Sequence, residues 1–337
     1  MAGCTPTAPT AAPAPTLPQA AGPAAGGAAP AWIGLGLKGS LLLIVPGPNG
    51  TSLQRMDLGS GSLRPVYQAP DRALISTALL SPDGNQILLA YAPPPTEQTQ
   101  LVYTSLYLLA ADGKSAPKAV FSSPPVDEAY FAPVWAADGK SIYTSHFKRG
   151  GDNTPDRFSI DRVTLDGQLK PVLADAEWPS LSPDGQRMAY VSAAPGGPND
   201  LYLAGIDGSN PHLALPAGAF PAVDDHFFTP DGKGIVFSAV NPQPAPNPTP
   251  SLFERIFGID VVAAHNVPSD WYVIAQDTGK IQRLTTLEDT GMYATLSPDR
   301  RRVAFIAASG IYVMNLDGTQ ITQLTDQIAT GTVDWQQ

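Results

Sequence analysis

The sequence predicts an all-β protein in which one four-stranded unit recurs along the chain. The first observation is a turn of the form Ser/Thr-Pro-Asp followed by Gly or Arg, which appears four times, with aspartates at positions 83, 184, 231 and 299. The second is another turn, usually Asp-Gly, that follows each of these after two further β-like runs. The third is composition: 36 Pro and 31 Gly residues accompany 43% hydrophobic residues. Such a chain has many tight turns and enough apolar side chains for a core.

Each Ser/Thr-Pro-Asp turn lies between two apolar runs that alternate as strands do. Runs such as STALL, EWPSL and MYATL precede it, and runs such as QILLAYA, RMAYVSA and RVAFIAA follow it. A fifth turn, at residues 136–139, lacks the proline but has the same flanking runs. Proline sets φ at the second turn position and the aspartate accepts a local backbone N–H. We therefore expect these aspartates to be structural and not catalytic.

The second turns close hairpins between the outer two strands of each unit. They contain Asp112, Asp166, Asp207, Asp277 and Asp317, each followed at once or one residue later by Gly. Asp-Gly between alternating runs is a strong short-range hairpin signal. Each unit is therefore four short antiparallel strands.

Counting the units predicts a closed ring. Five complete units occupy residues from about 70 to about 325. Ahead of them, residues 40–45, 52–58 and 63–68 supply only three strands, and residues 332–335 resemble the missing first strand. Pairing of the N- and C-terminal segments would complete a sixth blade and remove an exposed edge. The predicted fold is a six-bladed β-propeller of four-stranded antiparallel blades over residues 32–337, with an insertion at 242–268.

The repeated unit resembles the WD40-like repeat of TolB-type six-bladed propellers. The likeness rests on the run of apolar strand, Ser-Pro-Asp-Gly, strand, Ile/Leu-Tyr strand and Asp-Gly, and it extends over roughly residues 32–337. It implies a propeller fold and an extracytoplasmic scaffold that works as a monomer and contacts cell-envelope partners. One fold hosts many tasks, so the resemblance implies no particular chemistry.

The first 31 residues read as a tether ahead of the propeller. The stretch from Met1 to Leu37 contains no charged residue, and residues 5–30 are almost entirely Ala, Pro, Thr and Gly. Such a composition predicts a disordered, extended stalk. Ala2-Gly3-Cys4 ahead of it resembles the processed start of a bacterial lipoprotein, which implies lipidation of Cys4 and anchoring at a membrane. The alternative is an ordinary exposed cysteine in a disordered tail.

Charge and motifs exclude several functions. A net charge of −10 argues against nucleic-acid binding, and a single cysteine excludes an internal disulfide framework and cysteine-based zinc clusters. The chain has no G-x-S-x-G elbow, no H-E-x-x-H and no P-loop. Its histidines, His146, His212, His226 and His265, are dispersed. We interpret His226, which follows two aspartates, as a solvated loop residue.

Carboxylates precede the first strand of every blade. The set is Asp71, Asp127, Glu128, Asp175, Glu177, Asp224, Asp225, Glu288, Asp289 and Asp326. In a propeller these connections surround one mouth of the central channel, on the face opposite the Asp-Gly hairpins. The ring could hold Ca²⁺, which prefers oxygen ligands, with Asp127, Asp175, Asp224, Asp225 and Asp289 as candidate ligands. It could equally attract a basic partner, or be a solvated rim of turn-forming acids.

The long insertion should lie on the same face and carries a candidate docking element. Ser251 to Glu254 form a capping-box pattern, so a short helix is expected from about Leu252. Its apolar stripe would consist of Leu252, Phe253, Ile256 and Phe257. The stripe could pack on its own propeller, bind a partner, or touch a membrane shallowly. Lys148, Arg149 and Arg157, from a smaller insertion, are expected as internal partners of the acids.

Two functions fit these residues. The first is a non-catalytic, membrane-tethered extracytoplasmic propeller that binds a cell-envelope protein or a glycan through the insertion-bearing face. The alternative is a propeller enzyme, a glycan or lactone hydrolase, that uses channel-mouth carboxylates and Ca²⁺. Glycoside hydrolysis needs two carboxylates about 5–10 Å apart with different pKa values, and the sequence does not identify a pair.

Overall fold

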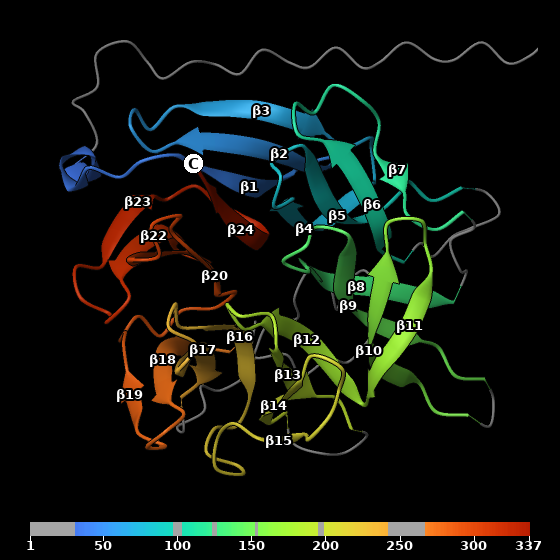
Figure 1. Ribbon diagram of the computed structural model, residues 1–337. Coiled ribbons are helices and arrows are strands. Elements are labelled where there is room, and N and C mark those ends of the chain that lie inside the picture. Colours follow the sequence, from blue (N-terminus) through green and yellow to red (C-terminus); the bar gives the residue numbers. More distant parts are fainter. Residues whose placement is uncertain (1–30, 97–102, 123–126, 152–153, 195–198, 242–266) are drawn as a thin grey trace, which may run out of the picture.

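The protein is a ring of six four-stranded antiparallel sheets, as the repeats predict (Figure 1). The computed structural model describes residues 31–96, 103–122, 127–151, 154–194, 199–241 and 267–337. A single 3-10 turn, η1 (Ala31–Leu35), precedes the strands in the described part. No helix in these ranges is long and apolar enough to cross a membrane.

The blades are numbered I to VI, starting with the blade in which the two ends of the chain pair. Blade I is β24 (Thr330–Gln336), β1 (Ser40–Gly47), β2 (Gly50–Asp57) and β3 (Leu63–Gln68). Blade II is β4 (Leu74–Leu80), β5 (Gln86–Ala92), β6 (Ser105–Ala110) and β7 (Lys118–Ala119). Blade III is β8 (Glu128–Trp135), β9 (Ser141–Lys148), β10 (Arg157–Thr164) and β11 (Leu169–Ala174).

The remaining three blades follow in chain order around the ring. Blade IV is β12 (Ala176–Leu181), β13 (Arg187–Ser192), β14 (Leu201–Gly205) and β15 (His212–Leu213). Blade V is β16 (Val223–Phe228), β17 (Gly234–Val240), β18 (Ser269–Ala275) and β19 (Ile281–Arg283). Blade VI is β20 (Tyr293–Leu296), β21 (Arg302–Ala307), β22 (Gly310–Asn315) and β23 (Thr322–Thr325).

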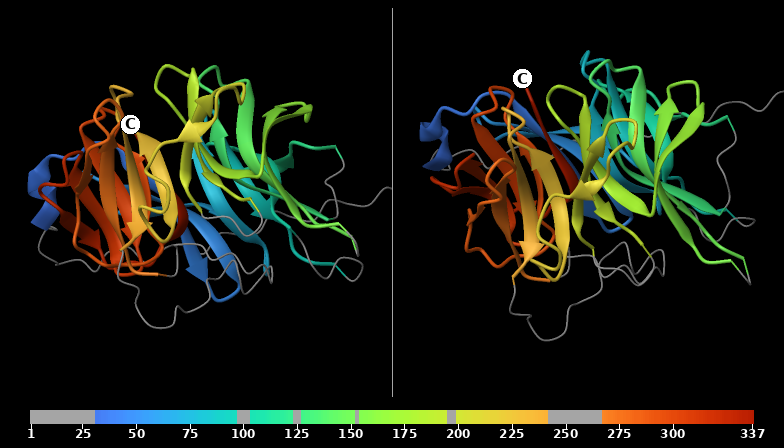
Figure 2. Two further views of the ribbon diagram at one scale, coloured as in Figure 1. Left: turned by 90° about the horizontal axis from the view of Figure 1, so that it is seen from below. Right: turned by 60° about the horizontal axis from the view of Figure 1, so that its bottom comes forward.

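The strands run between two faces of the ring, and the two kinds of turn share one of them (Figure 2). Because each blade is a simple antiparallel meander, the Ser/Thr-Pro-Asp turns and the outer Asp-Gly hairpins are at the same ends of the strands. We call this the turn face. The opposite face, here the loop face, is where the innermost strands begin. Val240 ends β17 and Ser269 begins β18 at the loop face, so the long insertion starts and finishes there.

The repeated aspartates act inside their own turns, as expected. Asp83 Oδ1 accepts hydrogen bonds from Ser81 Oγ at 2.5 Å and from the Asn85 amide at 3.1 Å. The Gln86 amide returns to Ser81 Oγ at 3.0 Å. The same bonds recur around Asp184, Asp231 and Asp299. Hydrogen bonds from the hydroxyl side chain hold the pKa of each of these aspartates below its usual value.

The two ends of the chain close the ring without a disulfide. β24 pairs with β1, so that Ser40 faces Gln336 and Leu42 faces Asp334. The indole of Trp335 donates to the Lys38 carbonyl at 2.9 Å, and that of Trp32 donates to the Leu324 carbonyl at 2.7 Å. This confirms the predicted pairing of the terminal segments.

Trp335→Ala should destabilise the protein by about 3–5 kcal/mol, because it leaves a cavity where the closing strand joins blade I. The side chain is 7% exposed and packs with the cluster that joins blades VI and I. Urea unfolding measures the loss, and Gln337→Ala, at an exposed neighbouring residue, is the control. Equal stability of the two variants would contradict a closing role for Trp335.

Candidate functional site

The acids predicted at the loop face lie in three different environments. Asp127 and Asp175 are exposed beside the starts of β8 and β12. Asp289 accepts hydrogen bonds from the Thr290 amide at 2.7 Å and the Ser309 amide at 3.2 Å. Asp224 and Asp225 lie within β16. The described ranges contain no group of three or more His, Cys, Asp or Glu side chains placed to hold a metal ion. The calcium site therefore stays a prediction.

One of the candidate acids, Asp224, lies near a further acid of the rim, Glu177, between the innermost strands of blades V and IV. Glu177 on β12 and Asp224 on β16 are each 6% exposed, and the negative charge of Asp224 acts on Glu177. Burial, reinforced by Asp224, raises the pKa of Glu177 to about 8. Burial likewise raises the pKa of Asp225 to about 8, although its Oδ2 accepts the Ala294 amide at 2.7 Å. That bond joins blade V to blade VI.

Aromatic rings from three blades lie beside these acids. Trp178 contacts Phe131 of β8, with ring centroids 5.8 Å apart, and Tyr293 of β20, at 6.2 Å. Blade V separates the strands that carry Trp178 and Tyr293, so this ring contact crosses the channel. Burial, with the negative charges of Asp224 and Asp225, raises the pKa of Tyr293 well above its usual value. The channel at this level is lined by aromatic rings and by two carboxyls, those of Glu177 and Asp225, whose raised pKa favours the protonated form at neutral pH.

His226 belongs to this buried region, and its interpretation as a solvated loop residue was wrong. It is 4% exposed, and its Nδ1 donates to the Asp224 carbonyl oxygen at 3.1 Å. Burial lowers its pKa. The apolar run that follows the two aspartates already marked an innermost strand, which was the available signal for burial.

A second polar cluster, which the sequence did not indicate, lies on blade III near the loop face. His146 Nδ1 is 2.7 Å from Asp161 Oδ2, and its Nε2 is 3.1 Å from Glu128 Oε2. Lys148 Nζ donates to Glu128 Oε1 at 2.7 Å, which confirms Lys148 as an internal partner of the acids. Tyr130 stacks on the His146 ring with centroids 4.4 Å apart. With both ring nitrogens bonded, His146 joins β8, β9 and β10.

The other two predicted cations, Arg149 and Arg157, make different contacts. The Arg149 guanidinium lies over the Tyr103 ring, 5.6 Å from its centroid. Arg157 is opposite Lys148 in the pairing of β9 with β10. Within the described residues, neither arginine forms an ion pair with an acid.

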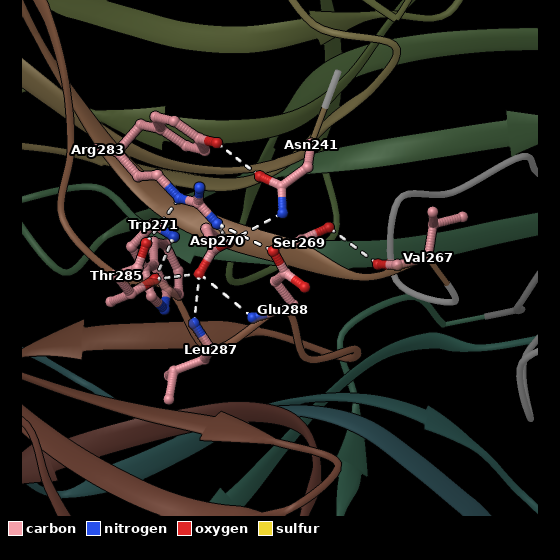
Figure 3. A network of polar contacts seen from close by, with 10 residues as sticks. Asn241, Val267, Ser269, Asp270, Trp271, Arg283, Thr285, Leu287 and Glu288 are labelled. Atoms are coloured by element: carbon pink, nitrogen blue, oxygen red, sulfur yellow. Dashed lines mark hydrogen bonds and ion pairs between the residues drawn. The ribbon is translucent and has the colours of Figure 1, made fainter. Parts of the chain in front are cut away.

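A buried polar network holds the two ends of the long insertion (Figure 3). Asp270, 0% exposed, pairs through Oδ2 with Arg283, and Oδ2 also accepts Asn241 Nδ2 at 3.0 Å. Its Oδ1 accepts the Thr285 hydroxyl and the Leu287 amide, both at 2.7 Å. Asn241, which directly precedes the insertion, is therefore anchored to β18 through Asp270 and Tyr272.

Two sets of predicted site residues lie outside the described residues. They are Cys4, the proposed lipidation site, and Leu252, Phe253, Ile256 and Phe257, the proposed docking stripe. Lipidation and docking stay predictions.

The turn face also carries an open groove of about 580 Å³ between blades V and VI. Pro230, Val273 and Leu316 contribute apolar surface, and Lys233 and Arg300 contribute positive charge. Arg300 has φ 58°, whereas Gly84, Gly185 and Gly232 occupy the corresponding turn position elsewhere. The groove holds no catalytic constellation.

Comparisons with known proteins agree with this architecture. A family model described as the dipeptidyl peptidase IV (DPP IV) N-terminal region matches residues 261–337. No curated protein matches the chain. Among solved structures, TolB from Acinetobacter baumannii aligns with a TM-score of 0.59 and 18% identity, over 88% of this chain and 66% of TolB. The chain thus spans just under two thirds of that TolB.

Two enzymes share the fold. An oligogalacturonate lyase in complex with manganese aligns with a TM-score of 0.50 and 15% identity, over 81% of this chain and 70% of the lyase. A puromycin-hydrolyzing peptidase from Mycobacterium tuberculosis aligns with a TM-score of 0.54 and 15% identity, over 88% of this chain and 48% of the peptidase. At these identities the likeness concerns the fold alone. The protein is a six-bladed β-propeller with the architecture of the TolB propeller.

Proposed function

We propose that the protein is a non-catalytic binding scaffold that recognises a cell-envelope protein or glycan at the loop face. The observation that carries this proposal is that the channel carboxylates are buried or bonded within the propeller. Asp225 is bonded to the backbone of the next blade, and Glu177 and Asp224 are buried. A carboxyl that is bonded to the neighbouring blade, and carboxyls that are buried away from solvent, are poorly placed to take part in turnover. The long insertion also starts and finishes at the loop face, next to Asn241, which is hydrogen-bonded to Asp270.

The proposed location is outside the cytoplasm, with the protein tethered at a membrane. This rests on the resemblance of Ala2-Gly3-Cys4 to a lipoprotein start, on the composition of the following stalk, and on the shared fold with TolB. Metabolic labelling with a fatty acid tests the tether. Label that is lost in Cys4→Ser supports it, and equal labelling of both proteins overturns it.

Phe253→Ala combined with Phe257→Ala should reduce partner recovery by at least tenfold if the insertion is the docking element, because aromatic anchors dominate most interfaces. The measurement is a quantitative pull-down of envelope proteins and glycans by the intact chain. Leu213→Ala with Ile321→Ala, which removes two exposed apolar side chains elsewhere, is the matched control. Unchanged recovery with the phenylalanine variant would overturn the docking role.

A hydrolase is the second candidate, and one observation favours it. Glu177, with its pKa raised to about 8, retains a proton at neutral pH, as a general acid must. Glu177→Gln should then abolish hydrolysis of glycan or lactone substrates while leaving the fold intact. If this variant still hydrolyses a glycan or lactone that the unaltered protein hydrolyses, Glu177 is not the general acid.

A further inference from the structure

Two arginines face each other across neighbouring strands of blade I. Arg55 on β2 is directly opposite Arg64 on β3, and the same row continues through Leu42 to Asp334 on β24. Paired residues of antiparallel strands project from the same side of a sheet, with Cβ atoms about 4.5–5.5 Å apart. Like charges in this relation destabilise a sheet. The pair is a cost to the fold of a chain whose net charge is −10.

The row lies on the side of blade I that packs against blade II. Leu42, Leu53 and Val66 from this side share an apolar cluster with Ile75 and Ile87 of blade II. Arg55 is half-buried at the edge of the cluster, and Arg64 is exposed. Burial and the charge of Arg64 both lower the pKa of Arg55, and Asp334 opposes them. A guanidinium keeps its charge even so, and a charge beside apolar side chains needs a nearby anion.

The nearby carboxylates, Asp334 and Asp57, accept hydrogen bonds from other residues. Asp334 Oδ2 accepts the Leu80 amide at 2.9 Å and Gln336 Nε2 at 3.1 Å, and burial raises the pKa of Asp334. Asp57, which acts on Arg64, accepts the amide and the hydroxyl of Ser60 at 2.8 and 2.7 Å. Within the described residues neither arginine has an ion pair. The buried Nε of Arg55 has no hydrogen-bond partner there.

We propose that Arg55 and Arg64 form a binding site for a tetrahedral oxyanion, a phosphate or sulfate group. Two adjacent guanidinium groups offer several N–H donors to the oxygens of such an anion, and the bound charge removes the repulsion between them. Half-buried Arg55 supplies the inner donors and exposed Arg64 supplies the outer ones. The adjacent apolar cluster lowers the local dielectric and so strengthens the attraction. This site is independent of the loop face and of the proposed scaffold function.

Inorganic phosphate is the first probe. Phosphate at about ten times its Kd should raise the melting temperature of the full chain by about 2–4 °C relative to sodium chloride of equal ionic strength. Arg55→Gln and Arg64→Gln should each weaken phosphate binding, measured by titration calorimetry, by at least tenfold. Arg301→Gln, at an exposed arginine of blade VI, is the matched control and should bind as the unaltered protein does.

The variants also separate binding from folding. Without phosphate, Arg64→Gln should melt at the same or a higher temperature than the unaltered protein, because the like-charge pair is gone. Vesicles containing phosphatidylglycerol form a second arm: arginine-dependent sedimentation shows that the phosphate can belong to a lipid headgroup, whereas calorimetric binding alone assigns the site to a soluble anion. Equal phosphate affinity of the unaltered protein and both arginine variants, or no binding at all, would overturn the proposal.

Discussion

Replacing Glu177 with Gln is expected to stabilise the protein at neutral and alkaline pH and to flatten its pH dependence. The pKa of Glu177 rises from 4.5 to about 8 because the side chain is buried beside Asp224. The folded protein thus binds this proton more tightly than the unfolded chain does. Its contribution to stability is fully present below pH 4.5 and is lost as the pH rises toward about 8. The whole loss corresponds to at most roughly 5 kcal/mol, and glutamine avoids it.

Urea unfolding between about pH 5 and about pH 9 measures this effect. Asp175→Asn, at an exposed acid two residues away, is the control and should leave the slope unchanged. Asp225 contributes a slope of the same sign, because its pKa is also raised to about 8. His226 acts oppositely: burial lowers its pKa from 6.5, so its contribution is lost as the pH falls below that value. Parallel pH profiles for Glu177→Gln and the unaltered protein would contradict the assignment.

Asp270→Ala should destabilise the protein by about 2–5 kcal/mol, because it removes a fully buried acceptor and leaves two donors unsatisfied, each at a cost of about 1–3 kcal/mol. The change leaves the Thr285 hydroxyl and the Leu287 amide without their acceptor, and it removes the nearer of the two carboxylates that contact Arg283. Blade V and its junction with β20 should be affected most, because the Leu287 amide lies on the connection into blade VI. Urea unfolding measures the loss, and hydrogen exchange locates it.

Two further variants test the cause of this loss. Asp277→Ala removes an exposed carboxylate from the same blade and should cost little. Arg283→Met added to Asp270→Ala should recover part of the stability, because it removes the cation that the first change leaves with the exposed Glu288 alone as a carboxylate contact. Additive losses in the double variant would show that the ion pair is not the source of the effect.

The repeat structure was predictable because its signals are local. A Ser/Thr-Pro-Asp turn is closed by contacts within five or six residues, as the bonds of Asp83 and Ser81 show. The alternation of apolar residues in a strand is equally local, so the order of strands in each blade could be predicted from the sequence. The closure by β24 also followed, because three N-terminal strands lacked a fourth and the C-terminal segment matched it.

The channel was not predictable in the same way. Sequence placed Asp224, Asp225 and Glu177 on one rim with seven other acids, and all ten looked alike. The fold buries Glu177 and Asp224 but leaves Asp127 and Asp175 exposed. This difference depends on the side chains that neighbouring blades bring to the channel. Trp178 of blade IV and Tyr293 of blade VI, for example, contact each other although blade V lies between them in the chain.

The all-β class, the number of blades and the closure of the ring could all be predicted from the repeats in the sequence. Turn chemistry and the period-two pattern of strands are properties of a few adjacent residues, so they can be recognised without knowing which residues pack against them. Which charges are buried, and what they meet, follows from the packing of the blades: Glu177 of blade IV is buried beside Asp224 of blade V, and Asp334 of blade I accepts the Leu80 amide of blade II. Burial and Coulomb interactions depend on residues distant in the chain, so they exist only once the blades are packed.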